Sequence, residues 1–122
     1  MAKKILIVDD DRNLASLLSD YFQEHGFDTM VARDGEQAVR FAHETKPDII
    51  ILDILLPLGG GINIYKTLKL SSYTDTIPVI FITAYDSEEI RSEVLTLGGR
   101  HFFSKPFKVE EMLEKVQLIL NK

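Results

Sequence analysis

Cysteine is absent from this chain of 122 residues, and no apolar run is long enough to span a membrane. The first absence excludes disulfide bonds and thiolate metal sites. The short apolar stretch near the start runs into three aspartates, which argues against a signal peptide or a membrane anchor. The few histidines, His25, His43 and His101, share no metal-ligand spacing. We therefore expect a cytoplasmic protein that does not bind membranes.

Basic residues are outnumbered by acidic ones, 14 against 19, which gives a formal net charge of -5. An acidic domain repels nucleic acid, so we expect no direct contact between this domain and DNA or RNA. Hydrophobic residues make up 45% of the chain, which is enough for a packed core. The length fits one domain, which we expect to cover residues 1–122.

Short apolar runs alternate with longer segments in which apolar residues recur at helical spacing. Strands are predicted at residues 5–8, 29–32, 49–52, 79–82 and 102–103. Helices are predicted after them, at about residues 14–22, 34–45, 62–70, 86–97 and 109–120. Continuous apolar strands between helices indicate a parallel sheet that is covered on both faces. The expected fold class is α/β, a doubly wound (βα)5 flavodoxin-like sandwich whose five-stranded parallel sheet has the order 2-1-3-4-5.

Two pairs of residues have the spacing of a capping box, in which a side chain at the start of a helix accepts a backbone hydrogen bond. The pairs are Asp34 with Gln37 and Asp86 with Glu89. We expect each aspartate to open a helix.

Further local expectations concern apolar faces and a loop. The first and last helices are expected to use Leu17 and Leu118 among their apolar residues. The segment with Pro57 and the glycines at 59–61 is expected to be a flexible loop. It lacks the lysine and hydroxyl residue of a nucleotide-binding phosphate loop.

Carboxylates follow two strands that adjoin in the expected order. Asp53 interrupts the apolar run 49–56, and Asp9, Asp10 and Asp11 follow the first strand. An unpaired buried carboxylate is costly, so a purely structural aspartate that caps a turn is the weaker alternative for Asp53. One of Asp10 and Asp11 is expected to cap the next helix. The remaining carboxylates converge beyond the strand ends, where oxygen ligands without histidine or cysteine suit Mg²⁺, and Mn²⁺ is also compatible.

Two further residues at strand ends complete a set that suits phosphate chemistry. Thr83 offers a hydroxyl donor, and Lys105 offers an ammonium that can reach a phosphoryl oxygen. Taken alone, Thr83 is as readily explained as a β-branched strand residue and Lys105 as a solvated loop lysine. Their common position at the carboxyl ends of strands favours the functional interpretation.

Four segments in order carry a resemblance: ILIVDD at 5–10, LDILLP at 52–57, ITA at 82–84 and KPF at 105–107. At these spacings the chain resembles the receiver domain of two-component response regulators, in a form like the chemotaxis regulators. The resemblance covers essentially the whole chain. It implies the strand order given above.

The resemblance also implies residue roles. Asp53 would be the phosphoacceptor, and Lys105 would pair with the phosphoryl group. Asp9 and Asp10 would hold Mg²⁺ together with Asp53 and the backbone carbonyl of Leu55, with Asp10 favoured as a direct ligand. Lys105–Pro106 would be a cis peptide.

A second set of implied roles concerns switching. Thr83 would be the switch hydroxyl, and Phe102 the switch aromatic, where many family members have tyrosine. Leu55 and Tyr85 occupy positions that tune hydrolysis of the acyl phosphate, and their bulk predicts slow self-dephosphorylation. The residues Leu56 and Gly60, like the segment 99–101, depart from the usual family pattern without removing a chemical group.

The family implies partners. A histidine kinase or phosphotransfer protein would donate the phosphoryl group, and the face made by the fourth helix, fifth strand and fifth helix would control an output domain or a downstream protein. Homodimerisation on phosphorylation is compatible with this face. We do not expect multiple-turnover enzyme activity on an external substrate.

Three alternatives remain open. A haloacid-dehalogenase-like phosphatase also forms an aspartyl phosphate, but residues 9–13 do not complete its motif. A flavin-binding domain needs a phosphate loop where this chain has three aspartates. A receiver-like scaffold that accepts no phosphate would not need the complete residue set.

Overall fold

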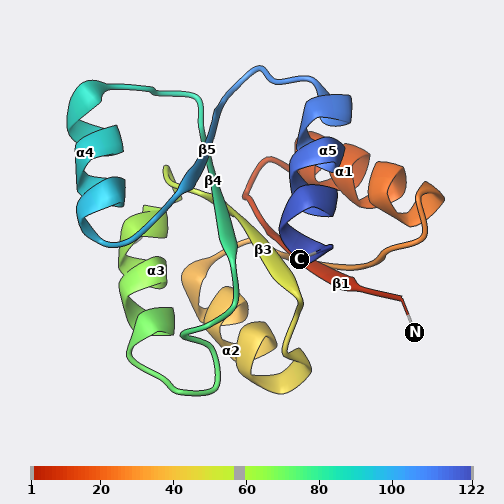
Figure 1. Cartoon of the computed structure of the whole chain (residues 1–122), viewed down its shortest axis with the longest axis horizontal. Helices are drawn as coiled ribbons and strands as arrows, with labels where there is room; N and C mark the ends of the chain where they lie inside the picture. The colour runs from red at the N-terminus through yellow and green to blue at the C-terminus, as the bar shows by residue number, and fades with distance from the viewer. Residues whose placement is uncertain (1, 57–59, 122) are drawn as a thin grey trace.

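The computed structural model describes residues 2–56 and 60–121, and in it a five-stranded parallel sheet lies between two layers of helices (Figure 1). The strand order is β2-β1-β3-β4-β5, so the predicted fold class and order are confirmed. The elements in chain order are β1 (Lys4–Val8), α1 (Arg12–Glu24), β2 (Asp28–Ala32), α2 (Gly35–Thr45), β3 (Ile49–Asp53), α3 (Gly60–Lys69), β4 (Val79–Thr83), α4 (Glu88–Thr96), β5 (His101–Ser104) and α5 (Val109–Leu120).

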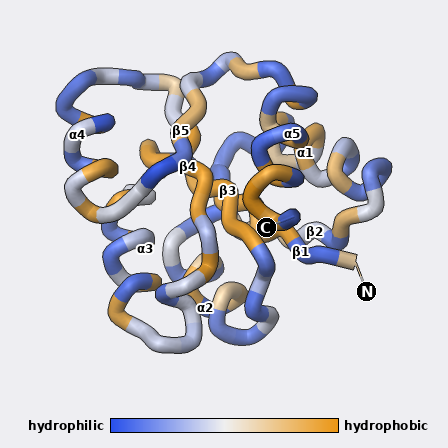
Figure 2. The backbone as a smooth tube through the Cα atoms, in the orientation of Figure 1, coloured by the Kyte–Doolittle hydropathy of each residue, from blue (hydrophilic) through white to orange (hydrophobic). Residues whose placement is uncertain are grey.

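Two hydrophobic cores lie on opposite faces of the sheet. Because side chains alternate along a strand, Ile5 and Ile7 of β1 enter the core under α1 and α5, whereas Leu6 and Val8 enter the core under α2, α3 and α4. Figure 1 shows the same division of the helices, and Figure 2 shows the apolar strands in the middle of the molecule. Burial on both faces explains the continuous apolar runs in the sequence.

The first predicted capping box is confirmed and the second is wrong. Asp34 accepts a hydrogen bond from the backbone N–H of Gln37 at 2.8 Å, at the start of α2. At α4, however, the cap is Ser87, which accepts from the N–H of Ile90 at 3.2 Å. Asp86 lies one residue too early to cap this helix, and its carboxylate contacts other side chains instead.

Several local expectations are corrected. Leu17 and Leu118 are each 56% exposed, because the buried stripes of α1 and α5 follow other residues at helical spacing. Helix α3 begins at Gly60, before the expected Ile62, so Gly61 lies in the first turn of a helix and not in the expected loop. Gly60, the first residue of the helix, has a φ of +70°. Pro57 and Gly59 lie outside the described residues.

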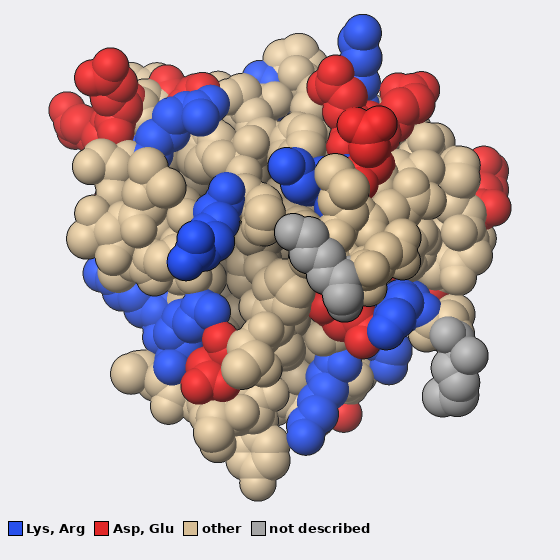
Figure 3. Space-filling model, in the orientation of Figure 1, with Lys and Arg blue, Asp and Glu red and all other residues tan. Residues whose placement is uncertain are grey.

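Charged side chains gather in several places on the face shown in Figure 3. Figure 3 shows acidic side chains over α4 and near the start of α5, and basic side chains over α3. The first turns of α4 and α5 each carry two glutamates, which interact favourably with the helix dipole, and α3 ends with Lys66 and Lys69. In the part of the chain that the structure describes, no helix has the length and apolar character needed to cross a bilayer.

Candidate functional site

Three carboxylates meet where β1 and β3 end. Asp9 and Asp10 follow β1, Asp53 is the last residue of β3, and one oxygen from each lies within 4.8 Å of the others. Asp9 is fully buried and Asp53 is 3% exposed, whereas Asp10 is exposed. The two strands are neighbours and parallel, so their carboxyl ends bring these residues together as predicted.

Lys105 joins the two buried carboxylates. Its Nζ lies 3.0 Å from Oδ2 of Asp9 and 3.0 Å from Oδ2 of Asp53. The backbone holds the lysine in place, because its N–H donates to the carbonyl oxygen of Thr83 at 2.7 Å. The Lys105–Pro106 peptide bond is cis, as the resemblance implied.

The charges of this cluster influence one another. Burial raises the pKa of Asp9 to about 6, and the nearby charge of Asp53 adds to the rise, while hydrogen bonds from Asp11 and Lys105 oppose it. Burial alone would lower the pKa of Lys105, but its hydrogen bonds to Asp9 and Asp53 outweigh this and raise it. Lys105 therefore stays cationic, yet one ammonium faces three carboxylates and leaves an excess of negative charge.

Backbone donors fix the orientation of the buried carboxylates. Oδ1 of Asp9 accepts from the N–H of Asp11 at 2.9 Å, and Oδ1 of Asp53 accepts from the N–H of Leu55 at 2.9 Å. Asp11 itself is the N-cap of α1. This settles which neighbouring aspartate caps the helix and leaves the carboxylate of Asp10 available at the exposed edge.

Thr83 lies at the end of β4 and is fully buried. Its hydroxyl accepts from the N–H of Tyr85 at 3.0 Å, and among the described residues no hydrogen bond joins it to Asp53. Tyr85 is 68% exposed, and Leu55 is 48% exposed. Phe102 lies on β5 and is partly buried.

Two polar residues that contact Asp86 were not identified from the sequence. Ser104 ends β5, and its hydroxyl donates to Asp86 at 2.6 Å. Arg91 of α4 forms a two-pronged ion pair with the same carboxylate. Asp86 and Arg91 are five residues apart, which is not one of the usual contact spacings of a helix. Ser104 lies 18 residues from Asp86, so only the tertiary structure reveals these contacts.

The donor set fits a hard divalent cation. It consists of carboxylate oxygens without histidine or cysteine, and it includes the exposed Asp10, whose side chain has no hydrogen-bond partner among the described residues. Mg²⁺ prefers one or two protein carboxylates and leaves positions for other oxygen ligands. The excess negative charge at this cluster favours a cation of this kind.

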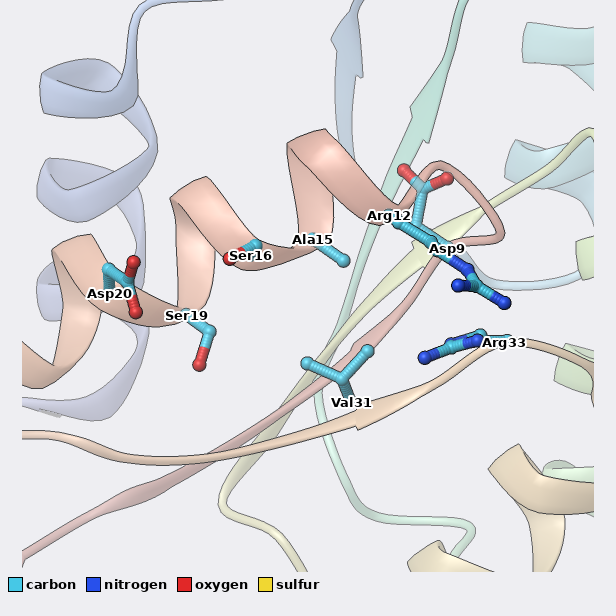
Figure 4. A pocket seen from close by; sticks show the side chains of 8 residues that line it. All are labelled: Asp9, Arg12, Ala15, Ser16, Ser19, Asp20, Val31 and Arg33. Atoms are coloured by element: carbon cyan, nitrogen blue, oxygen red, sulfur yellow. The ribbon is translucent and has the colours of Figure 1, made fainter.

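A neighbouring pocket of about 250 Å³ lies between α1 and β2 (Figure 4). Asp9 borders it, but its carboxylate points away from Arg12 and Arg33, whose guanidinium groups lie near each other (Figure 4). Neither Asp53 nor Lys105 lines this pocket. Of the three clustered carboxylates, the pocket is therefore lined by Asp9 and not by Asp10 or Asp53.

Comparison with known proteins identifies the family. The model of the response regulator receiver domain matches residues 5–117. The chain belongs to the response regulator receiver domain family. Receiver domains of response regulators are signalling domains rather than classical enzymes, and they bind Mg²⁺ at an acidic pocket. The predicted family and the phosphoacceptor type of switch are confirmed at this level.

Similar proteins agree with this assignment. The alkaline phosphatase synthesis transcriptional regulatory protein PhoP of Bacillus subtilis is 37% identical over 122 residues, covering 100% of this chain and 50% of the relative. The transcriptional regulatory protein CpxR of Escherichia coli is 40% identical over 119 residues, covering 98% of this receiver domain and 50% of CpxR. The chain thus spans about half the length of these curated relatives.

Solved structures extend the similarity to three dimensions. The chemotaxis protein CheY4 of Vibrio cholerae has a TM-score of 0.92 at 28% identity, and the match covers 98% of this chain and 100% of that one. The receiver domain of the Francisella response regulator 1452 has a TM-score of 0.89 at 33% identity, with 98% and 97% covered.

Proposed function

We propose that Asp53 accepts a phosphoryl group from a histidine kinase or phosphotransfer protein. The observation that carries this proposal is the arrangement of Asp9, Asp10 and Asp53 around a common space, with Lys105 bridging the two buried carboxylates at 3.0 Å. Such a cluster is hard to explain by folding alone, because buried like charges destabilise a domain.

In the proposed reaction, a carboxylate oxygen of Asp53 attacks phosphorus. A new P–O bond forms while the P–N bond of the phosphohistidine breaks. The electron pair of that bond stays on the imidazole nitrogen, which takes up a proton from solvent, so the histidine leaves as neutral imidazole. The ammonium of Lys105 already contacts the nucleophile, so it lies close enough to compensate charge on the incoming phosphoryl oxygens. The N–H of Leu55 orients the carboxylate.

Asp9, Asp10 and Asp53 would hold Mg²⁺, or Mn²⁺, with the backbone carbonyl of Leu55 as a further ligand. The bound cation would supply charge neutralisation for the phosphoryl oxygens. The protein residues provide the fixed oxygen donors, and the hydrogen bond from Asp11 keeps Asp9 oriented towards the cluster.

After phosphorylation, Thr83 would move towards the phosphate and Phe102 would fill the space that it leaves. The face made by α4, β5 and α5 would then change its population of conformations, which controls an output domain, a downstream protein or a second copy of the chain. Leu55 and Tyr85 at the site rim would restrict the water that hydrolyses the acyl phosphate. Slow self-dephosphorylation therefore stays a prediction.

We infer the cellular setting from the family. Residues 1–122 would act as one receiver domain in the cytoplasm, and the domain would not contact nucleic acid directly, in keeping with its net charge of -5. It would not turn over an external substrate. The comparisons favour neither the phosphatase nor the scaffold that accepts no phosphate.

The proposal is tested with acetyl phosphate as the donor. With Mg²⁺ present, we expect the protein to gain the mass of one phosphoryl group, and peptide mapping after borohydride trapping should locate it at Asp53. Addition of EDTA should prevent the gain. If the protein gains no phosphate, the result contradicts the assignment and favours the scaffold alternative. If the phosphate is found at another residue, the assignment of Asp53 is contradicted.

Mg²⁺ should stabilise the fold in the absence of any phosphodonor. At a Mg²⁺ concentration ten times its Kd, linkage gives a gain of about 1.4 kcal/mol in the free energy of unfolding. In Asp10→Asn, which removes the charge of an exposed ligand but keeps its shape, we expect Mg²⁺ to bind at least about tenfold more weakly, since even the loss of a residue that only supports a metal ligand costs that much. Urea unfolding at several Mg²⁺ concentrations measures both quantities. Asp20→Asn, an exposed aspartate on α1, is the control, and an equal loss in both variants would rule out a specific site.

A further inference from the structure

Four residues connect α4 to β5 beside the proposed switch, and we call them the Arg91 latch: Asp86, Arg91, Phe102 and Ser104. Nε and Nη2 of Arg91 each donate to the carboxylate of Asp86 at 2.7 Å. The hydroxyl of Ser104 donates to Asp86 at 2.6 Å. The guanidinium carbon of Arg91 lies 4.4 Å from the centroid of the Phe102 ring, which is a cation–π distance.

The latch joins three segments that are separate in the sequence. Asp86 belongs to the loop between β4 and α4, Arg91 to α4, and the other two members to β5. Hydrogen bonds from Arg91 and then from Ser104 hold the pKa of Asp86 at about 2, so its carboxylate is ionised at neutral pH. A planar guanidinium can pair with a carboxylate along its edge and cover an aromatic ring with its face, and Arg91 does both.

The same loop restrains Thr83. The hydroxyl of Thr83 is engaged by the N–H of Tyr85, one residue before Asp86. Thr83 also pairs in register with Ser104 across β4 and β5. Any movement of the Thr83 hydroxyl to another partner breaks its bond to the loop, and the loop is fastened to β5 through Asp86. The position of Thr83, the loop and the Phe102 ring are therefore mechanically connected.

We propose that Arg91 is a positioning residue for the switch, which holds Phe102 and the β4–α4 loop in the conformation of the unphosphorylated domain. This inference rests on the proposed function of Asp53. The latch favours one of two conformations, so phosphorylation has to work against it, and loosening the latch shifts the population towards the other conformation. Arg91 touches neither Asp53 nor Lys105 by any hydrogen bond or ion pair among the described residues, so it acts through Phe102 and the loop.

The test compares Arg91→Gln with a matched control on another helix. Arg40 of α2 also has an acidic partner, Glu36 at 3.8 Å, and its guanidinium carbon lies 5.2 Å from the Phe41 ring centroid. Arg40→Gln therefore removes the same charge, an ion pair and a cation–π contact away from the latch. Arg91→Lys keeps the charge but loses the planar fork, and Ser104→Ala removes only one hydrogen bond.

Two readouts are measured. The first is the NMR signals of the Phe102 ring without metal or phosphodonor, assigned by their loss in Phe102→Leu. In Arg91→Gln these signals should move towards their positions in the phosphorylated wild type, and in Arg91→Lys and Ser104→Ala they should move less. The second is the rate of phosphorylation by acetyl phosphate with Mg²⁺, which should rise about fivefold in Arg91→Gln, the scale of an exposed ion pair plus a cation–π contact. Arg40→Gln should change neither.

The outcomes separate this inference from the proposed function. If the wild type takes up no phosphate at Asp53, the proposed function fails, and this inference falls with it. If the wild type is phosphorylated but Arg91→Gln has unchanged ring signals or an unchanged or lower rate, only the latch is overturned. Circular dichroism checks that Arg91→Gln is folded. If it is not, Ser104→Ala decides, and unchanged ring signals in that variant overturn the inference.

Discussion

Asp53→Asn should lose phosphorylation by acetyl phosphate by at least about a thousandfold, because an amide lacks the nucleophilic oxygen anion that the reaction needs. The substitution preserves the shape of the side chain, and the amide oxygen can still accept from the N–H of Leu55. It also removes one of three clustered negative charges, so the fold should persist. The measurement is the rate of phosphoryl incorporation, followed by mass, together with the unfolding midpoint.

Asp20→Asn provides the matched control for this result. It removes the same charge from an exposed position on α1 and should leave the rate unchanged. Incorporation by Asp53→Asn at the wild-type rate would show that another residue accepts the phosphate. A variant that is unfolded would instead reveal that the carboxylate is needed for folding, which its position in a like-charged cluster does not lead us to expect.

Gly61→Ala should destabilise the domain by about 3 kcal/mol, the upper range for a methyl group forced into a packed site. A Cβ at this position would overlap the carbonyl oxygen of Asp53 and lie 2.8 Å from Cα of Ile54. Both obstacles are backbone atoms, which cannot rotate away. In addition, the N–H of Gly61 donates to the carbonyl oxygen of Ile54 at 2.8 Å, so the first turn of α3 is fixed against the end of β3.

This clash has a functional consequence, because relief of the overlap must shift either α3 or the backbone of Asp53. We therefore expect slower phosphorylation in Gly61→Ala along with the lower stability, both measured in the same preparation. Gly26→Ala is the control. Its Cβ would meet nothing within 4 Å, and its φ of +88° should cost only about 1 kcal/mol. Equal losses in the two variants would contradict the close approach of Gly61 to β3.

The capping-box pattern predicted the start of α2 correctly and the start of α4 wrongly, for a physical reason. At Asp34 the capping spacing was sufficient, because no other strong partner competes for that carboxylate among the described residues. At Asp86 the same spacing failed, because Arg91 and Ser104 offer charge-assisted and hydroxyl hydrogen bonds that a neutral backbone N–H does not match. Ser87 then caps the helix. Because Ser104 lies on β5, its hydrogen bond to Asp86 cannot be predicted from local spacing.

The amphipathic pattern also predicted where the helices lie more accurately than it predicted which of their residues are buried. The apolar pattern located α5, but Leu118 lies on its exposed side, since Met112 and Val116 define the buried stripe four residues apart. A leucine two residues after Val116 points roughly to the opposite side of the helix. Composition marks a helix as apolar, whereas packing against the sheet determines which side is covered.

The sequence by itself determined the alternation of buried strands and helices, and it placed carboxylates at the ends of two strands, because backbone periodicity and burial are local properties. Only the tertiary structure decided which charges meet. Lys105 contacts Asp9 across 96 positions of the chain and Asp53 across 52, and Asp86 reaches Ser104 across 18. Such contacts depend on the order of the strands and on the path of the loops that connect them. The local spacing of residues in the sequence does not give the distances between residues that are far apart in the chain.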